Sequence, residues 1–275
     1  MTREQKYQAF RALHKRAGTF VIPNPWNAGT ARILTTLGFE ALATTSAGYA
    51  FAVGRRDSGT DLTREGILAN AKKIVEATDL PVSADLQDGF GQAPETCAET
   101  IRLASESGLA GGSIEDSTDD SNNPIYDFQL AVERVAAAAK AAHDCQFLLT
   151  ARAENFLHGR PDLADTIRRL QAFDDAGADV LYAPGLPSLD SIRQVCASVG
   201  KPVNVVMGLK GATFSVEELA AAGVKRISVG GTLARAALGA FVRAAREIRD
   251  KGTFTYSAEA LPPAEAKAFM AAGKR

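Results

Sequence analysis

The stretch from Pro81 to Gly91 reads Pro-Val-Ser-Ala-Asp-Leu-Gln-Asp-Gly-Phe-Gly. Its first part is a short apolar run typical of a buried strand, and this run ends in the carboxylate of Asp85. Asp88 and a glycine-containing turn at 89–91 follow at once. A carboxylate at the end of a buried strand is costly to desolvate unless a cation or hydrogen-bond donors meet it. We therefore expect a positive charge beside Asp85.

Two further apolar runs end in the same manner. Residues 111–114 lead into Glu115, and residues 147–151 lead into Arg152 and Glu154. If the three runs are consecutive parallel strands, their carboxyl ends share one rim, where sheets and barrels of this kind keep their sites. Two acids beside an arginine then indicate a metal site next to a site for an anion.

Along the whole chain, short apolar runs alternate with segments of helical character. The runs expected as strands are residues 19–22, 39–43, 82–85, 113–115, 147–151, 179–182, 202–206 and 226–229. Eight such β/α alternations without a break in composition are typical of a (β/α)8 TIM barrel, an α/β fold. An open, doubly wound sheet is the alternative.

Several connections on the presumed active rim are expected to lack regular structure. Residues 44–48 read as a small-residue turn whose amides could receive an anion. The polar segment 51–61 reads as a mobile loop, and the segment 116–126, rich in Ser, Thr, Asp and Asn, has the composition of turns and lids. Gly230-Gly231-Thr232 precedes a long helix and is similar to the phosphate-binding turn of many barrels.

We expect a single barrel domain over residues 1–275, because no segment has the composition of a linker. Residues 250–275 form a C-terminal helical appendage, in which Leu261-Pro262-Pro263 precedes alanine-rich sequence. Such an appendage docks on its own barrel or on a neighbouring subunit, and it therefore points to a homo-oligomer.

The composition excludes several classes of protein. The chain is 46% hydrophobic with a net charge of −1, so it has no electrostatic footprint for nucleic acid. The charged N-terminus lacks the core of a signal peptide, and no apolar run approaches membrane-spanning length, so we expect a cytoplasmic protein. The three cysteines are widely separated and favour neither disulfides nor a thiolate metal site.

Three motifs together carry a resemblance to a known family. They are the Asp-x-x-x-Gly-Phe-Gly run from Asp85, the Ile-Glu-Asp run around Glu115 and the Ala-Arg-x-Glu run around Arg152. At these separations they resemble the isocitrate lyase/phosphoenolpyruvate (PEP) mutase superfamily, which includes phosphonopyruvate hydrolase and oxaloacetate decarboxylase. The resemblance implies a modified barrel whose last helix swaps onto a partner, giving dimers or tetramers.

The resemblance also implies roles for individual residues. Mg²⁺ would be held by Asp85, with water-mediated help from Glu115. A small 2-oxo acid would chelate this ion through its carboxylate and keto oxygens. The substrate would be bound by Thr45, Ser46, Ala47 and Arg152. Asp57 would lie on a gating loop that closes over the metal.

Two more residues are candidates for substrate binding. Trp26, in the first strand-to-helix connection, could form one wall of the pocket or have only a packing role, and Asn204 lies in the seventh predicted strand.

His158 lies on the presumed rim, where it could relay protons or be a solvated loop residue. Asp85 and Arg152 could also form an ion pair with a purely structural role.

Departures from the family pattern narrow the reaction. The usual second acid of the metal motif is Gln87 here, whose amide oxygen could bind a metal-held water. The lid after the fourth strand, 117–123, has no cysteine to protonate a departing carbanion, which argues against isocitrate or methylisocitrate lyase activity. A lid without a strong acid suits a leaving group such as CO₂, so we expect a lyase acting through a pyruvate enolate, similar to oxaloacetate decarboxylase.

Other functions remain open. Phosphonopyruvate hydrolase or PEP mutase chemistry would cleave a C–P bond at the same site, and a non-catalytic protein could bind a 2-oxo acid without turnover. The glycine turn at 230–232 raises a phosphate-ester-binding barrel as a further hypothesis. A Schiff-base mechanism is disfavoured because Lys201, Lys210 and Lys225 do not follow a predicted strand into the pocket.

Overall fold

The computed structural model describes residues 1–57, 61–118 and 120–271 of the chain. Its sheet has eight parallel strands in the order β1-β8-β7-β6-β5-β4-β3-β2. The strands are β1 (Phe20–Ile22), β2 (Leu42–Ala43), β3 (Val82–Asp85), β4 (Gly111–Glu115), β5 (Leu148–Arg152), β6 (Val180–Tyr182), β7 (Val203–Val206) and β8 (Arg226–Ser228). One hydrogen bond, from the Ala43 amide to the Pro23 carbonyl at 3.0 Å, bridges the remaining gap between the first two strands. The nearly closed sheet confirms the predicted (β/α)8 barrel.

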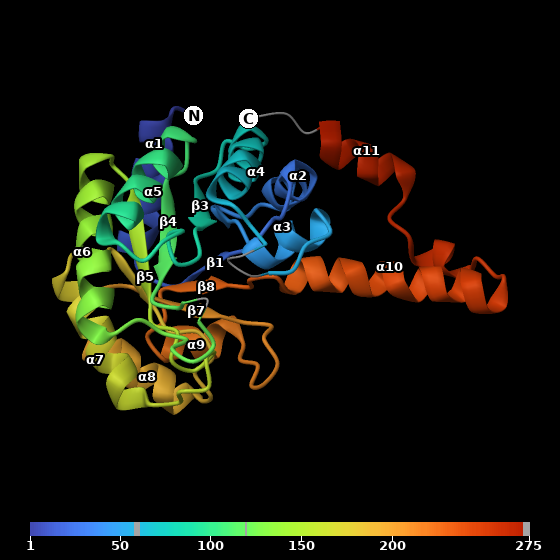
Figure 1. The fold of residues 1–275 in the computed structure, drawn as a ribbon. Coiled ribbons are helices and arrows are strands. Elements are labelled where there is room, and N and C mark those ends of the chain that lie inside the picture. Colours follow the sequence, from blue (N-terminus) through green and yellow to red (C-terminus); the bar gives the residue numbers. More distant parts are fainter. Residues whose placement is uncertain (58–60, 119, 272–275) are drawn as a thin grey trace.

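Helices alternate with the strands and surround the sheet (Figure 1). They are α1 (Arg3–Lys15), α2 (Ala28–Thr36), α3 (Ser46–Ala52), α4 (Arg64–Glu76), α5 (Pro94–Glu106), α6 (Phe128–Asp144), α7 (Leu163–Asp175), α8 (Leu189–Ser198), α9 (Val216–Ala221), α10 (Thr232–Lys251), a 3₁₀ turn η1 (Thr255–Glu259) and α11 (Pro263–Ala271). Polar side chains that accept an amide hydrogen bond begin most of them, for example Asn27 at α2 and Thr63 at α4.

The register of the strands brings the predicted site residues to one rim. Glu115 pairs with Arg152 across β4 and β5, and Arg152 pairs with Tyr182 across β5 and β6. Glycine in β4 allows close packing at this point, because a Cβ on Gly112 would lie 2.8 Å from Leu86 and 2.9 Å from Phe147. The chain therefore sets the side chains of consecutive strand ends beside one another.

The structure corrects one local prediction on this rim. Residues 44–48 do not form an isolated turn, because Ser46–Ala52 is the helix α3. Thr45 caps this helix with its side-chain oxygen, which accepts a hydrogen bond from the Gly48 amide at 3.3 Å. The alanines that follow favour helix, so the helix also includes the beginning of the predicted loop 51–61. Residues 58–60 of that loop, residue 119 of the predicted lid and residues 272–275 of the appendage lie outside the described residues.

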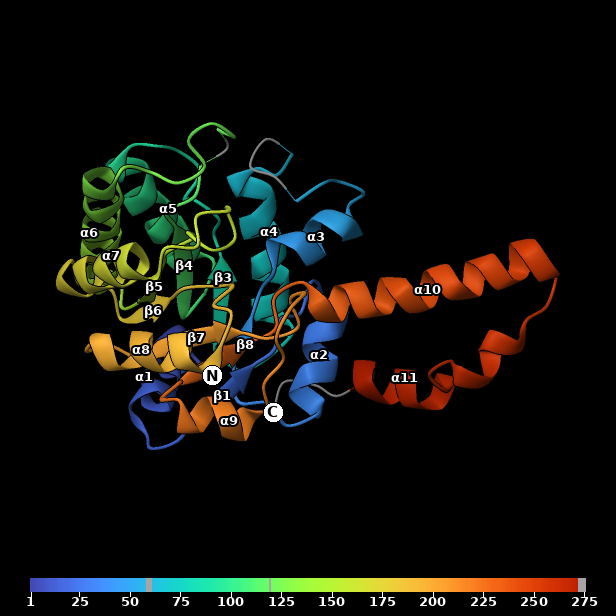
Figure 2. The ribbon, with the colours of Figure 1, turned by 90° about the horizontal axis from the view of Figure 1, so that it is seen from below.

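The C-terminal segment forms an arm that leaves the barrel. Helix α10 projects outward, and α11 returns beside it toward α2 in both ribbon views (Figures 1 and 2). The guanidinium of Arg32 on α2 donates to the Met270 carbonyl at 2.7 Å, which ties the end of the arm to its own barrel. Ala234 is the buried residue of α10, whereas Phe241 is 70% exposed.

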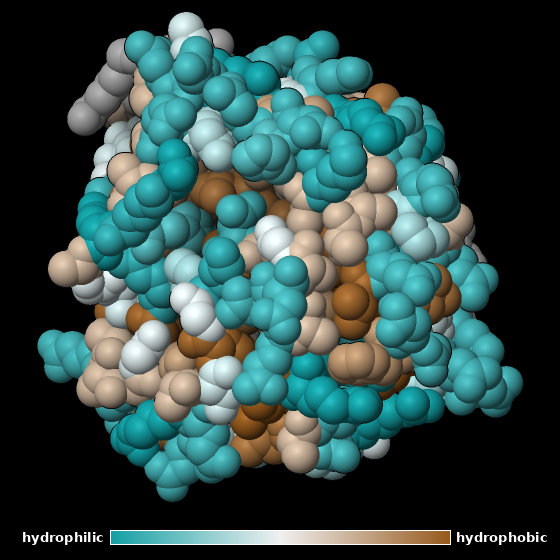
Figure 3. All heavy atoms as spheres, turned by 90° about the vertical axis from the view of Figure 1, so that its left-hand side faces the viewer, coloured by the Kyte–Doolittle hydropathy of each residue, from teal (hydrophilic) through white to brown (hydrophobic). Residues whose placement is uncertain are grey.

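The face of the barrel that lies away from the arm is mostly polar. Polar residues cover most of this face, and hydrophobic residues show only in small patches between them (Figure 3). Exposed large apolar side chains also occur on the barrel, for example Leu37 and Val216, but they are most numerous on the arm, where they are Leu233, Leu238, Phe241, Val242, Ile248, Phe254, Tyr256, Leu261 and Met270. Among the described residues, no helix is both long and apolar enough to cross a membrane.

Candidate functional site

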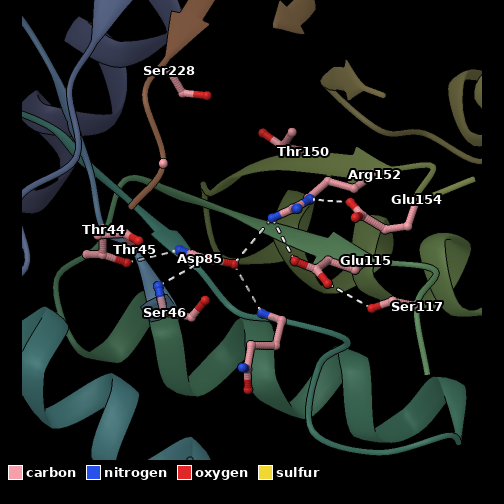
Figure 4. A network of polar contacts seen from close by, with 12 residues as sticks. Thr44, Thr45, Ser46, Asp85, Glu115, Ser117, Thr150, Arg152, Glu154 and Ser228 are labelled. Carbon is pink, nitrogen blue, oxygen red and sulfur yellow. Dashed lines mark hydrogen bonds and ion pairs between the residues drawn. The ribbon is translucent and has the colours of Figure 1, made fainter. Parts of the chain in front are cut away.

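Arg152 is the centre of a cluster of carboxylates at the end of β5. Its Nη1 lies 2.7 Å from Glu115 Oε1 and 3.4 Å from Asp85 Oδ1, and its Nε lies 2.7 Å from Glu154 Oε1. Figure 4 shows the three acidic side chains pointing toward the guanidinium from three different segments. Glu154 holds Arg152 as expected from their spacing, and Asp85 has the expected cationic neighbour.

Tyr182 at the end of β6 also supports this arginine. The guanidinium carbon of Arg152 lies 4.8 Å from the centre of the Tyr182 ring, in a cation–π arrangement. Burial raises the pKa of Tyr182, so its hydroxyl keeps the proton. The sequence analysis missed this residue, although it ends a strand as Asp85 and Arg152 do, and the same criterion would have found it.

Asp85 is fixed by backbone amides as well as by the arginine. Its Oδ2 accepts a hydrogen bond from the Ser46 amide at 3.0 Å, and its Oδ1 accepts one from the Gln87 amide at 3.4 Å. The amide predicted to receive the substrate carboxylate therefore contacts Asp85 in this structure. Ser46 is the first residue of α3, so the beginning of this helix lies directly against Asp85.

Glu115 is the most perturbed acid of the cluster. Its Oε2 accepts a hydrogen bond from the Ser117 hydroxyl at 2.7 Å, and its Oε1 contacts Arg152. Burial raises the pKa of Glu115 to about 8; Arg152 opposes this rise, while the charges of Glu154 and Asp85 add to it. Three carboxylates thus compete for one guanidinium, and a further cation would relieve their repulsion.

A pocket of about 350 Å³ opens above this cluster. It brings together most of the predicted site residues, which are Thr45, Ser46, Ala47, Asp57, Asp85, Glu115 and Arg152. Five of its lining side chains are carboxylates, at positions 57, 85, 88, 115 and 154, against one arginine. The pocket is therefore strongly acidic and suits a cation.

Asp57 reaches this pocket from the loop that follows α3. Although the residue as a whole is exposed, its carboxyl group faces the pocket beside Ser46 and Asp85. Partial burial and the charge of Asp85 raise the pKa of Asp57, and hydrogen bonding to Ser46 opposes the rise. Asp57 therefore lines the pocket, and its gating role stays a prediction.

Gln87 offers an oxygen that no neighbour uses. Its backbone has φ 50°, a left-handed conformation that is uncommon for a residue other than glycine. The side-chain Oε1 is buried in the pocket wall and has no hydrogen-bond partner among the described residues. A buried acceptor without a partner is costly, and a metal-bound water or a cation would satisfy it.

Other predicted residues lie apart from the pocket or at its margin. Among the described residues, the lining includes His158, Gly230 and Gly231 but neither Trp26 nor Asn204. Trp26 lies against α3, since a Cβ on Gly48 would meet it at 2.8 Å, and Asn204 is 1% exposed in the barrel interior. Substrate contact by these two residues remains a prediction.

The segment after β4 is tied down at both ends. Ser117 and Ile125 form an antiparallel bridge, and the Tyr126 hydroxyl donates to Asp88 at 3.0 Å. At the start of the segment, buried Asp116 pairs with Arg169 at 3.0 Å. Asp116 is therefore a structural anchor, whereas its neighbour Glu115 faces the pocket.

Comparison with known proteins agrees with the motifs. Residues 10–249 match the phosphoenolpyruvate phosphomutase family. A Mycobacterium tuberculosis (strain H37Rv) protein without an assigned function is 30% identical over 245 residues, covering 88% of this chain and 89% of that protein. The 2-methylisocitrate lyase of Escherichia coli K12 is 29% identical over 226 residues, covering 79% of this chain and 75% of that enzyme.

Solved structures show the same relationship. A lyase/mutase homologue from Burkholderia cenocepacia J2315 has a TM-score of 0.96 and 58% identity, covering 99% of this chain and 98% of that one. A 2,3-dimethylmalate lyase has a TM-score of 0.85 and 28% identity, covering 99% and 96% of the two chains. The chain therefore belongs to the phosphoenolpyruvate phosphomutase family of the isocitrate lyase/PEP mutase superfamily, and it is an enzyme of the lyase type found there.

Proposed function

We propose that the protein cleaves or forms a C–C bond at C3 of a small 2-oxo acid through a pyruvate enolate, with oxaloacetate decarboxylation as the first version of this reaction. The observation that carries the proposal is the acidic pocket, in which five carboxylates surround one guanidinium at the carboxyl ends of the strands. Such a pocket suits a divalent cation, and a 2-oxo acid can chelate a cation that is held there.

The residues present fit Mg²⁺, the metal that the family resemblance implies. Asp85 and Glu115 would supply carboxylate oxygens, and Gln87, whose buried Oε1 has no hydrogen-bond partner among the described residues, lines the same pocket. Among the described residues, no group of three or more Asp, Glu, His or Cys side chains is arranged so that it could hold a metal ion by itself. Waters and the substrate would therefore have to complete the coordination of Mg²⁺, an ion that usually keeps several waters and takes one or two carboxylates. When bound, the ion would polarise the carbonyl of the substrate and stabilise the charge of the enolate.

The chain's own groups would do the remaining work. Arg152 is held from behind by Glu154 and Tyr182, so its Nη atoms are directed into the pocket and can donate to the developing enolate oxygen. The N-terminal turn of α3, at Ser46 and Ala47, would orient the substrate carboxylate. Asp57, on its loop, would exclude bulk water from the reacting atoms. CO₂ departs without needing a proton, which agrees with a lid that carries no cysteine.

Cleavage of a C–P bond is the second candidate. The family that the chain matches is named after PEP phosphomutase, and a Streptomyces platensis PEP phosphomutase has a TM-score of 0.84 and 26% identity. In this version Thr118 of the lid, which lines the pocket, would contact the phosphoryl group. A protein that binds a 2-oxo acid without turnover is the non-catalytic alternative.

A Mg²⁺-dependent screen for pyruvate release tests these functions. Each of the substrates oxaloacetate, phosphonopyruvate and branched malates is assayed with three proteins. These are wild type, Asp85→Ala and the exposed control Asp144→Ala. We expect turnover of at least one substrate, a loss of about 10³-fold or more in Asp85→Ala, and no change in the control. Undiminished activity of Asp85→Ala would show that the metal assignment is wrong, and binding without pyruvate release would support the non-catalytic alternative.

The exposed arm would complete the assembly. Helix α10 presents Leu238, Phe241 and Val242 to solvent, which is unusual for an isolated subunit. A second copy of the chain is the occupant that the family resemblance implies, through exchange of this helix between barrels. The active protein would then be a homodimer or a homotetramer.

A further inference from the structure

Below the active-site pocket, the barrel encloses a second, smaller cavity. It has a volume of about 60 Å³ and shares the walls Asp85, Arg152, Tyr182 and Gly230 with the pocket above. Its floor is formed by Asn204, Arg226 and Ser228 of β7 and β8. We call this space the floor cavity. In Figure 4, Thr150 and Ser228 lie on the far side of the Asp85–Arg152 pair from Ser117.

Arg226 is a buried cation whose hydrogen-bond partners among the described residues are all neutral. The residue is 5% exposed, and its Nε donates to Asn204 Oδ1 at 2.8 Å while its Nη2 donates to Thr150 Oγ1 at 3.0 Å. Its Nη1 lies 3.4 Å from His14 Nε2. Burial lowers the pKa of Arg226 only to about 10, so the guanidinium is charged at neutral pH.

His14 cannot provide the missing negative charge. Its Nδ1 lies 2.8 Å from the Phe10 carbonyl, which can only accept, so Nδ1 carries the proton and Nε2 accepts from Arg226. In the part of the chain that the structure describes, no carboxylate forms an ion pair with Arg226. Asp85 is the one acid lining the floor cavity, and both its oxygens are engaged by Ser46, Gln87 and Arg152.

The walls of the floor cavity supply further donors. Ser83 and Ser113 are nearly buried, and neither hydroxyl makes a hydrogen bond within the described residues, so both are free to donate into the cavity. The Ser228 hydroxyl accepts from Asn204 Nδ2 at 3.0 Å and also hydrogen-bonds to the Tyr182 side chain. Two unpaired hydroxyls and an uncompensated guanidinium therefore line a space that is large enough for one small ion or about two waters.

We infer that the floor cavity binds a small monovalent anion of the size of chloride, held by Arg226 and the serine hydroxyls. The ion would supply the counter-charge that this buried guanidinium lacks. Because Tyr182 lines both cavities and stacks on Arg152, the anion would also stiffen the support of the active-site arginine. This site adjoins the proposed metal and substrate positions, with which it shares the walls Asp85 and Arg152, but its own ligands would be Arg226 and the serine hydroxyls.

Bromide is a suitable probe, because its anomalous scattering distinguishes it from water. Crystals soaked in sodium bromide are expected to show an anomalous peak beside Arg226. In solution, the unfolding temperature of wild type should rise saturably with bromide but not with gluconate, which is too large for the cavity, at equal ionic strength. Arg226→Met should abolish the response.

Milder variants keep the test informative if Arg226→Met fails to fold. Ser113→Ala removes one donor and should raise the bromide concentration for half-maximal stabilisation about tenfold, the effect of one hydrogen bond to a charged group. The control Ser198→Ala, at a partly exposed residue of α8 that does not line the cavity, should respond as wild type does. A cavity that holds only water in bromide-soaked crystals, or equal stabilisation by bromide and gluconate, would overturn the inference.

Discussion

Among the single residues of the site, three carboxylates share one guanidinium as their ion-pair partner. Arg152 serves Asp85, Glu115 and Glu154 at once, and the charge of Glu154 is one cause of the raised pKa of Glu115. A residue such as Glu154, which is 1% exposed, therefore acts through its neighbours. Its substitution should change the pH dependence as well as the rate.

We expect Glu154→Gln to lower kcat/KM by about 10- to 100-fold, because Arg152 loses its charged support. Glu115 must be ionised to bind the metal, so activity at subsaturating Mg²⁺ should rise with pH through its pKa. Removing the Glu154 charge lowers that pKa, and the acid limb of the pH profile of kcat/KM should move to lower pH. The exposed Glu133→Gln is the control, and an unmoved acid limb would contradict the coupling.

His14 predicts a distinct pH dependence of stability. Burial and the charge of Arg226 lower its pKa from 6.5 to about 3. The stabilisation is therefore fully present above pH 6.5 and is lost as the pH falls toward 3, at up to about 1.4 kcal/mol per pH unit. Denaturant unfolding at pH 6.5 and pH 4 should show this loss in wild type and in the exposed control His143→Gln. In His14→Gln the slope should be smaller, and an unchanged slope would refute the assignment.

At the scale of elements, α3 is the helix on which the rim of the site depends. It is short, and its first amide contacts Asp85 while its residues Ser46 and Ala47 line the pocket. Its beginning is fixed by Thr45, which is 4% exposed. The position of the first turn, rather than the identity of a side chain, decides where these amides point.

Thr45→Ala should destabilise the protein by about 1 kcal/mol, because the Gly48 amide loses its acceptor. It should also raise KM, since the amides of α3 lose their fixed orientation. Thr63→Ala is the matched control, because Thr63 caps α4 in the same way at a distance from the reacting groups. Unfolding curves and steady-state kinetics separate the two effects. A KM that rises equally in both variants would mean that stability alone explains the change.

At the scale of the whole molecule, the arm of α10 and α11 distinguishes this chain from a closed, self-contained barrel. Helix α10 projects away from the barrel (Figure 2). The barrel buries the strands and the inner faces of its surrounding helices, whereas Leu238, Phe241 and Val242 of α10 are exposed to solvent. A second subunit would bury them, and assembly would then contribute to the stability of each barrel.

Phe241→Asp should therefore weaken the dimer by about 30-fold or more, as expected for an aromatic anchor at an interface. Light scattering after size-exclusion chromatography, repeated over a range of protein concentrations, measures the shift toward monomer. Val216→Asp, on an exposed position of α9 outside the arm, is the control. A wild-type protein that is monomeric at all concentrations would contradict the proposed assembly.

The barrel and the centre of the site could be predicted from the order of residue types along the chain. Alternating apolar runs and helices predict eight strands, and parallel strands necessarily bring their last residues to one rim, so Asp85, Glu115 and Arg152 could be predicted as neighbours. These features follow from local periodicity and from the geometry of a parallel sheet.

Contacts between segments that are distant in the chain could not be predicted in this way and became visible in the folded protein. The capped helix at Ser46, the ring of Tyr182 under Arg152 and the unpaired charge of Arg226 each join residues far apart in the chain. Burial and partner geometry set the pKa of Glu115 and leave the Gln87 oxygen without a donor, and neither can be read from a pattern of residue types. The physical reason is that desolvation and hydrogen bonding depend on the three-dimensional surroundings of a group, whereas periodicity records only its direction from the backbone.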